Sequence, residues 1–346
     1  MRPSRPPMLR LVPLGLLLTT LAWRTAAASD AALGRFEFTE PQMGVPFRVV
    51  LYAPDPATAT NAAQAVFARI RALNDVMSDY EFDSELSRLS RTAGSGDAVP
   101  VSAELWTVLG RAQDLARRTD GAFDVTVGPC VSVWRRARRD REMPTAARLA
   151  AARAATGWQH LELDAAARTA RLRVPRMRLD LGGIAKGYAA DQGLKVLADH
   201  GITRALISGG GDLAVSEPPP GEFGWRIELP PLDAPGAPAK SRFVRLRRAA
   251  LATSGDVFQY VEIDGVRYSH IVDPRTGLGL THRSLVTVIA PDGLTADSLS
   301  TAISVLGPER GRTLARREGV GLSLAWQQDG TIQTFTNRRF RRWLED

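Results

Sequence analysis

The sequence predicts an α+β fold with mixed, largely antiparallel sheets and helices packed against them. Two dipeptides, Asp264-Gly265 and Asp329-Gly330, each separate two runs of alternating apolar and polar residues. This is the pattern of a β-hairpin with a tight turn. Amphipathic helices occur between such strands in no regular order, which argues against a doubly wound parallel sheet.

The N-terminal half is predicted to hold the first strands, three amphipathic helices and a short strand pair. The helices are predicted where apolar residues recur every three or four positions, over residues 61–77, 103–118 and 145–155. Gly121 and Gly157 stand where the second and third helices should end. Strands are predicted over residues 36–52 and around Leu161 and Leu172.

The C-terminal half is predicted to consist mainly of strands: "RALISGG", "WRIEL", "FVRLRRAALATSG", "QYVEIDGVRYSHIV" and "LSLAWQQDGTIQTF". One helix, "TADSLSTAISVLG", interrupts them. The proline-rich "EPPPGEFG" and "PPLDAPGAPAK" are interpreted as surface loops, because strands continue on both sides.

The first residues have the pattern of a secretory signal peptide. A basic "MRPSRPPMLR" precedes the apolar "LVPLGLLLTTLAW" and an A-x-A site that ends at Ala28. We expect a signal peptide over residues 1–28 and one domain over 29–346. An uncleaved anchor is the alternative, although the apolar run is short for a membrane span and contains Pro13. No cysteine stands at the cleavage site, so no lipid anchor is expected by that route.

Composition narrows the class of protein. With 44% hydrophobic and 24% charged residues, the chain is typical of a globular protein. Cys130 is its one cysteine, which excludes an internal disulfide and a C-x-x-C metal site. The basic runs "WRRARRDRE" and "NRRFRRW" are interpreted as solvated faces, and nucleic-acid binding is not expected. An acidic or phosphorylated ligand is compatible with this charge.

The segment "DLGGIAKGYAAD" at residues 180–191 places two glycines before a predicted helix. It is not a P-loop, because Lys186 lies only three residues after Gly183 and is followed by Gly187. A glycine turn, a lysine and free N–H groups at a helix start nevertheless favour an anion. A simple strand-to-helix turn capped by Asp180 fits this stretch equally well.

In "TADSLSTA", Asp297 and Thr301 are four residues apart and so lie on one face of the predicted helix. A carboxylate and a hydroxyl suit Mg²⁺, which takes oxygen ligands and few of them from protein. The alternative is that Asp297 is only a favourable charge at a helix N-terminus.

His270 in "YSHIVDPRTG" is predicted to lie within a strand, on the same face as Tyr268 and Val272. A histidine can take a proton from a hydroxyl nucleophile near neutral pH. A packed or surface histidine is the alternative.

Two glycine-rich segments, "GAFDVTVGP" with Asp124 and "SGGGD" with Asp212, suggest a close approach of backbone to a ligand. No G-x-S-x-G elbow is present, so a serine hydrolase is not favoured.

Taken in order, eight segments resemble the FAD:protein FMN transferases of the ApbE family. They are "MG", "MSDYEFDSELSRL", "GAFDVTVGP", "DLGGIAKGYAAD", "SGGGD", "ATSGD", "SHIVDPRTG" and "VTVIAPDGLTADSLSTA". The resemblance extends over residues 36–344. It implies an ApbE-like (T-fold-like) single catalytic unit that binds FAD with Mg²⁺ and transfers FMN to a threonine or serine of a target redox protein subunit, releasing AMP. It leaves open an FAD pyrophosphatase, and a flavin-binding protein without turnover.

The resemblance also implies the site residues. The positions matching the family's FAD contacts are Met43, Tyr80, Ala122, Phe123, Asp124, Asp180, Lys186 and Val272. Those matching its Mg²⁺ site are Asp297, Thr301 and the backbone carbonyl of Gly183, with Ser300 adjoining. His270 matches the proposed general base.

The chain departs from the family's usual pattern in two places. Gln42 and Val45 stand where threonines are usual, next to the first "MG". The family's common lipoprotein cysteine is missing, so we expect a periplasmic or exported enzyme without a lipid tether.

Overall fold

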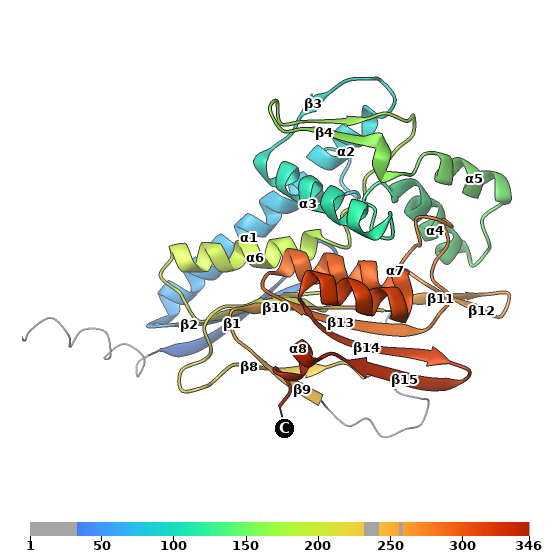
Figure 1. Ribbon diagram of the computed structural model, residues 1–346. Coiled ribbons are helices and arrows are strands. Elements are labelled where there is room, and N and C mark those ends of the chain that lie inside the picture. The colour runs from blue at the N-terminus through green and yellow to red at the C-terminus, as the bar shows by residue number, and fades with distance from the viewer. Residues whose placement is uncertain (1–32, 232–241, 256–258, 346) are drawn as a thin grey trace, which may run out of the picture.

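An eight-stranded antiparallel sheet forms the centre of the molecule (Figure 1). The computed structural model describes residues 33–231, 242–255 and 259–345. The strands follow the order β1-β2-β6-β7-β10-β13-β14-β15 across the sheet. Their bounds are β1 Gly34–Gln42, β2 Val45–Ala53, β6 Ala205–Gly209, β7 Asp212–Val215, β10 Ala249–Gly255, β13 Ser284–Ala290, β14 Gly321–Gln328 and β15 Thr331–Thr336.

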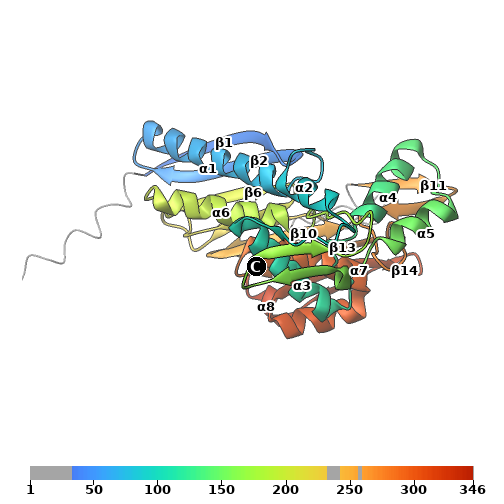
Figure 2. The ribbon, with the colours of Figure 1, turned by 90° about the horizontal axis from the view of Figure 1, so that it is seen from above.

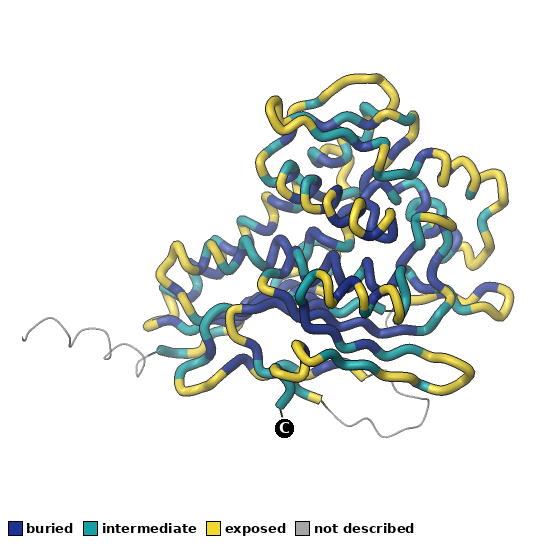
Figure 3. Tube along the Cα trace, in the orientation of Figure 1, coloured by how far each residue is buried: buried dark blue, intermediate teal, exposed yellow. Residues whose placement is uncertain are grey.

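Three helices cover one face of this sheet and pack side by side (Figure 2). They are α1 Pro56–Met77, α6 Ala185–Asp199 and α7 Gly293–Glu318. The period of two along β2 directs Phe47, Val49 and Leu51 into the core beneath the helices, whereas Val50 joins the core on the other face. The buried residues therefore concentrate along the sheet and the inner sides of these helices (Figure 3).

The opposite face of the sheet packs against a smaller layer. This layer consists of the strand pair β8 Trp225–Leu229 and β9 Arg242–Leu246, together with α8 Arg338–Arg341. Val244, Leu246 and Phe340 are fully buried in a core shared with Val50 and Ile289 of the sheet. Both faces of the central sheet are thus covered.

The remaining elements lie beyond the helical layer and to one side of it (Figure 1). They are α2 Glu85–Arg91, β3 Val99–Pro100, α3 Ala103–Thr119, α4 Gly128–Asp140, α5 Ala146–Ala154, β4 Leu161–Asp164, β5 Thr169–Leu172, and the hairpin of β11 Tyr260–Ile263 and β12 Val266–Ser269. A 3₁₀ turn, η2 Trp158–His160, precedes β4. Strands β3, β5 and β4 form a separate antiparallel sheet.

The predicted α+β class and both predicted hairpins are confirmed. Asp264 and Asp329 have positive φ angles of 51° and 49°, followed by glycines at 73° and 75°, which is the backbone of a type I′ turn. Within the parts of the chain that the structure describes, no helix combines the length and apolar character needed to cross a membrane. The predicted signal peptide and most of the loop "PPLDAPGAPAK" lie outside the described residues.

Two predictions were wrong in detail, and one helix was missed. "FVRLRRAALATSG" is not one strand, because Arg248 adopts a positive φ of 44° and the chain turns between β9 and β10. The basic run "WRRARRDRE" begins within α4 and is solvated only in part, because Trp134 is buried and Arg135 is half-buried. The short helix α2 was not predicted; its N-cap Ser84 accepts a hydrogen bond from the backbone N–H of Ser87.

The first turns of α6 and α7 are in backbone contact. A Cβ atom added to Gly187 would lie 2.0 Å from the carbonyl oxygen of Gly293, so only glycine fits there. Asp191 of α6 completes the contact, because its carboxylate accepts the backbone N–H groups of Gly293 (2.7 Å) and Leu294 (3.0 Å). This capping satisfies N–H groups that a helix start leaves without partners.

We therefore expect Gly187→Ala to lower the free energy of unfolding by about 2–3 kcal/mol, because the new methyl group must push two helices apart. The matched control is Gly110→Ala in α3, where an added Cβ meets no atom within 4 Å. That control should be neutral or stabilise by up to about 1 kcal/mol. Urea unfolding of both variants measures the difference, and equal midpoints would contradict the contact.

Candidate active site

One cavity of about 780 Å³ brings together all the site residues expected from the sequence. It opens between the β1–β2 turn, the segment after α1, the start of α4, the segment before α6, the ends of β7 and β10, and the first turns of α7. The expected residues among its lining are Met43, Tyr80, Ala122, Phe123, Asp124, Asp180, Gly183, Lys186, His270, Val272, Asp297 and Thr301.

Lys186 lies at the floor of the cavity and is held among oxygen atoms. Its Nζ is 3.2 Å from Asp212 Oδ2 and 3.9 Å from Asp297 Oδ2, and it donates a hydrogen bond of 2.8 Å to the carbonyl of Gly182. The Asp297 residue is only 2% exposed. Lys186 is therefore a cation that compensates buried carboxylates, and it is not a helix surface charge.

The electrostatics of this cluster follow from burial. Burial and the nearby Asp297 raise the pKa of Asp212 to about 7, although Lys186 opposes the shift. Burial likewise raises the pKa of Asp297. Burial alone would lower the pKa of Lys186, but the two carboxylates outweigh it and raise that pKa above the ordinary value. The lysine consequently stays charged.

Oxygen donors gather where α7 meets the glycine turn. Thr301 lies so close to Gly183 that a Cβ atom on that glycine would be 2.9 Å from Thr301 Oγ1. One turn earlier, Asp297 Oδ2 accepts the backbone N–H of Gly187 at 3.1 Å, which fixes the carboxylate. Ser254 Oγ lies 3.4 Å from Thr301 Oγ1 and 2.7 Å from Ser300 Oγ, so the hydroxyls support one another.

This donor set fits Mg²⁺. A carboxylate, a hydroxyl and a backbone carbonyl are all hard oxygen ligands, and Mg²⁺ keeps part of its shell for water or phosphate oxygens. Among the residues that the structure describes, no group of three or more His, Cys, Asp or Glu side chains is placed to hold a metal.

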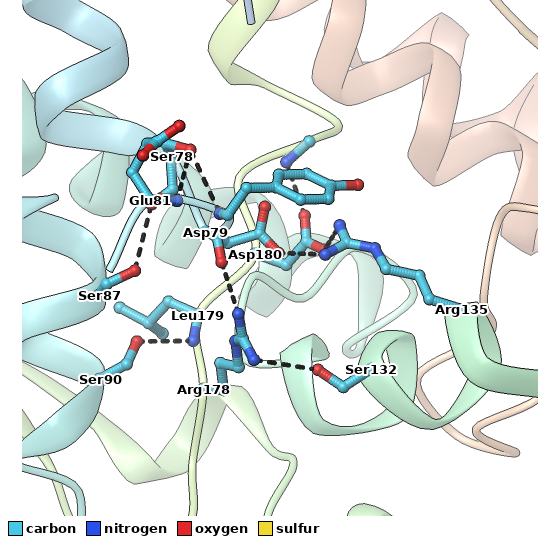
Figure 4. A network of polar contacts seen from close by, with 12 residues as sticks. Ser78, Asp79, Glu81, Ser87, Ser90, Ser132, Arg135, Arg178, Leu179 and Asp180 are labelled. Atoms are coloured by element: carbon cyan, nitrogen blue, oxygen red, sulfur yellow. Dashed lines mark hydrogen bonds and ion pairs between the residues drawn. The ribbon is translucent and has the colours of Figure 1, made fainter. Parts of the chain in front are cut away.

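A second charged network lies on the side of the cavity formed by α4 (Figure 4). Arg135 of α4 reaches Asp79 Oδ2 at 2.5 Å and Asp180 Oδ2 at 2.9 Å, and its guanidinium carbon lies 4.2 Å from the centre of the Tyr80 ring. Burial and Asp79 raise the pKa of Asp180, and Arg135 opposes this shift. Asp180 Oδ1 also accepts the backbone N–H of Gly182 at 2.8 Å.

Asp124 has a different setting from Asp180. Its Oδ1 accepts the backbone N–H of Thr126 at 2.8 Å and the hydroxyl of Thr126 at 2.7 Å. The same hydroxyl accepts the backbone N–H of Gly157 at 2.8 Å. Asp124 lines the cavity and at the same time fixes the turn that leads into α4.

His270 follows strand β12 and does not lie within it, so the predicted mid-strand position was wrong. The strand ends at Ser269, whose carbonyl accepts the indole N–H of Trp134 at 2.9 Å. His270 Nδ1 lies 3.2 Å from the carbonyl oxygen of Gln259. A carbonyl can only accept, so Nδ1 carries the proton and the basic lone pair belongs to Nε2.

Comparisons with known proteins show which family the chain belongs to. The model of the ApbE family matches residues 43–324. The chain belongs to the ApbE family. It is 33% identical over 309 residues to an FAD:protein FMN transferase of Klebsiella pneumoniae, covering 87% of each chain. It is also 33% identical over 336 residues to one of Vibrio cholerae, covering 93% of this chain and 98% of the relative.

Solved ApbE structures share the fold. The flavin transferase ApbE from Vibrio cholerae superposes with a TM-score of 0.80 at 30% identity, covering 90% of this chain and 99% of that one. The apo flavinyl transferase ApbE of Pseudomonas stutzeri gives 0.79 at 32% identity, covering 90% and 97%. The mixed antiparallel α+β architecture is therefore that of the family.

Four residues of this ApbE cavity were not among the expected site residues. Arg135 and Asp79 form the network beside Tyr80, Asp212 pairs with Lys186, and Ser254 contacts the hydroxyls of α7. "SGGGD" and "ATSGD" did single out the segments of Asp212 and Ser254. Arg135 stood in a basic run with nothing in the sequence to distinguish it from its neighbours.

We expect Lys186→Met to lower the free energy of unfolding by about 3 kcal/mol in metal-free buffer, because two buried carboxylates lose their cation. Lys195→Met, on the exposed side of the same helix, is the matched control and should change stability by less than about 0.5 kcal/mol. Adding Asp212→Asn to Lys186→Met should restore part of the loss. Chemical unfolding checks this, and a Lys186→Met variant as stable as the control would contradict the cluster.

Proposed function

We propose that this ApbE-family chain is a Mg²⁺-dependent FAD:protein FMN transferase. It would transfer FMN from FAD to a threonine or serine hydroxyl of a target redox protein through a phosphoester bond and release AMP. The observation that carries the proposal is the single cavity in which a histidine, a lysine, three oxygen donors and apolar and aromatic surface converge. The names of the curated relatives support it.

The diphosphate of FAD fits the floor of the cavity. Gly182 and Gly183 allow a close approach of the backbone, and Lys186 supplies a fixed positive charge. Asp297, Thr301 and the carbonyl of Gly183 would hold Mg²⁺. When bound, the metal would neutralise the phosphate oxygens and stabilise the charge that develops on them.

His270 is suited to activate the acceptor hydroxyl. Nε2 takes the hydroxyl proton, and the acceptor oxygen forms a bond to the phosphorus of the FMN half. The bond from that phosphorus to the bridging oxygen breaks, and AMP leaves with the bridging oxygen. The carbonyl of Gln259 holds Nδ1–H and so stabilises the imidazolium that forms.

Apolar and aromatic side chains suit the planar rings of FAD. Tyr80 is 76% exposed, with Arg135 stacked on its ring. Met43, Phe123 and Val272 add apolar surface to the cavity wall. Flat rings gain affinity from such surfaces because stacking and burial act together.

The location of the reaction is part of the proposal. The pattern of residues 1–28 supports removal of a signal peptide and a periplasmic or exported domain over 29–346. The target would then be an exported or membrane-bound redox subunit.

The test is to incubate residues 29–346 with FAD, Mg²⁺ and a flavin-accepting target and to look for a fluorescent target band in a denaturing gel. His270→Ala should slow transfer by about 10²–10⁴-fold, because the base is lost. Asp297→Asn and chelation of the metal should abolish the band. His200→Ala, at the exposed end of α6, is the control and should transfer at the normal rate.

Three outcomes would count against the proposal. A band that forms at the unmodified rate in both His270→Ala and Asp297→Asn removes the site assignment. Rapid release of free FMN and AMP, with no labelled target, identifies an FAD pyrophosphatase that uses water as the nucleophile. Recovery of unaltered FAD after long incubation with Mg²⁺ identifies a flavin-binding protein without turnover.

A further inference from the structure

Arg138 is a cation in the cavity wall that has no role in the proposed reaction. It lies one turn after Arg135 on α4, so both side chains project from the same side of the helix into the cavity. Arg135 is held by Asp79 and Asp180. Arg138 makes no hydrogen bond, ion pair or ring contact with any residue in the described part of the chain.

This setting is unfavourable for a guanidinium. Partial burial lowers the pKa of Arg138, and the neighbouring charge of Arg135 lowers it further, whereas only the phenol of Tyr80 opposes the shift. An arginine side chain carries five N–H donors and no acceptor, so it can form hydrogen bonds only with acceptor atoms. A partly desolvated cation without an acceptor costs stability, and such costs are typical of residues kept for a ligand.

Two other arginines of α4 do form ion pairs with a carboxylate. Arg136 and Arg139 point to solvent and pair with Asp140 at 3.2 Å and 3.0 Å. Arg138, like Arg135, faces the cavity beside Tyr80, whose ring is stacked by Arg135 and is otherwise largely exposed. The wall therefore offers a surface for a flat ring, with a donor-only group beside it.

We propose that Arg138 binds FAD directly and donates hydrogen bonds to the pyrimidinedione edge of the flavin ring, which stacks on Tyr80. This rests on the proposed function for the identity of the ligand. The flavin edge presents the carbonyl O2 and the N1 lone pair side by side, and both accept. The adenine edge places an amino donor beside N7 or N1, and that donor would face the donors of the guanidinium.

The experiment compares Arg138→Gln with Arg136→Gln, the same substitution on the same helix but on its exposed face. Both are made in the His270→Ala background, and binding of FAD, FMN and AMP is titrated with Mg²⁺ and no acceptor, by flavin fluorescence or calorimetry. Arg138→Gln should weaken the binding of FAD and of FMN by tenfold or more, because a charged hydrogen bond is lost. The affinity for AMP should stay unchanged. Arg138→Lys should recover only part of the affinity, because it lacks the planar fork.

A stability measurement separates a ligand contact from a structural role. Because Arg138 has no partner to lose, Arg138→Gln should unfold at the same temperature as Arg136→Gln or above it. Two results would overturn the inference. One is that both variants bind FAD with equal affinity; the other is that Arg138→Gln binds AMP more weakly and FMN with unchanged affinity.

The outcomes also separate this inference from the proposed function. If Arg138→Gln weakens FAD binding but the otherwise unmodified enzyme labels no target, the proposed function fails and this contact stands. If the enzyme labels its target and Arg138→Gln leaves the affinity for FAD unchanged, only this inference fails. No FAD binding by the His270→Ala background would overturn both.

Discussion

The site depends first on the ammonium of Lys186 between the carboxylates of Asp212 and Asp297. These three residues belong to α6, β7 and α7, so one charged contact ties two helices to the central sheet. Two buried carboxylates without a cation would repel each other and lose their hydration. The contact also requires backbone proximity, which Gly187 provides where α6 meets Gly293. Packing and electrostatics are therefore inseparable at the floor of the cavity.

The opposite side of the cavity repeats the same arrangement with an arginine. Arg135 lies between Asp79 and Asp180 as Lys186 lies between Asp212 and Asp297. The glycine turn is fixed between the two clusters, because Asp180 binds Arg135 and the carbonyl of Gly182 binds Lys186. A segment that must let a ligand approach its backbone cannot be held by bulky side chains. Here it is held by its charged neighbours, and the backbone of Gly183 stays within reach of the cavity.

Sequence patterns predicted the elements with strong periodicity and failed where tertiary contacts decide. The hairpin turns were found because Asp-Gly pairs suit positive φ angles. The end of β12 was not found; there the carbonyl of Ser269 accepts the indole N–H of Trp134, a contact between residues far apart in the sequence. Arg135 and Arg138 could not be distinguished from their neighbours, since five arginines stand within seven residues and the sequence does not show which of them face the cavity. The residues expected from the motifs line one cavity, but the sequence carried no sign that Lys186 also supports the fold.

The charges at the cavity floor explain why metal and substrate should bind together. With both carboxylates ionised, Asp212 and Asp297 outweigh Lys186 by one negative charge. Burial and the nearby Asp297 raise the pKa of Asp212 to about 7. An anionic diphosphate would meet repulsion there. A divalent cation on Asp297 and Thr301, as proposed, reverses the sign of the local charge and keeps the carboxylates ionised. Such a cation would therefore raise the affinity for the diphosphate, and by linkage the diphosphate would raise the affinity for the cation by the same factor.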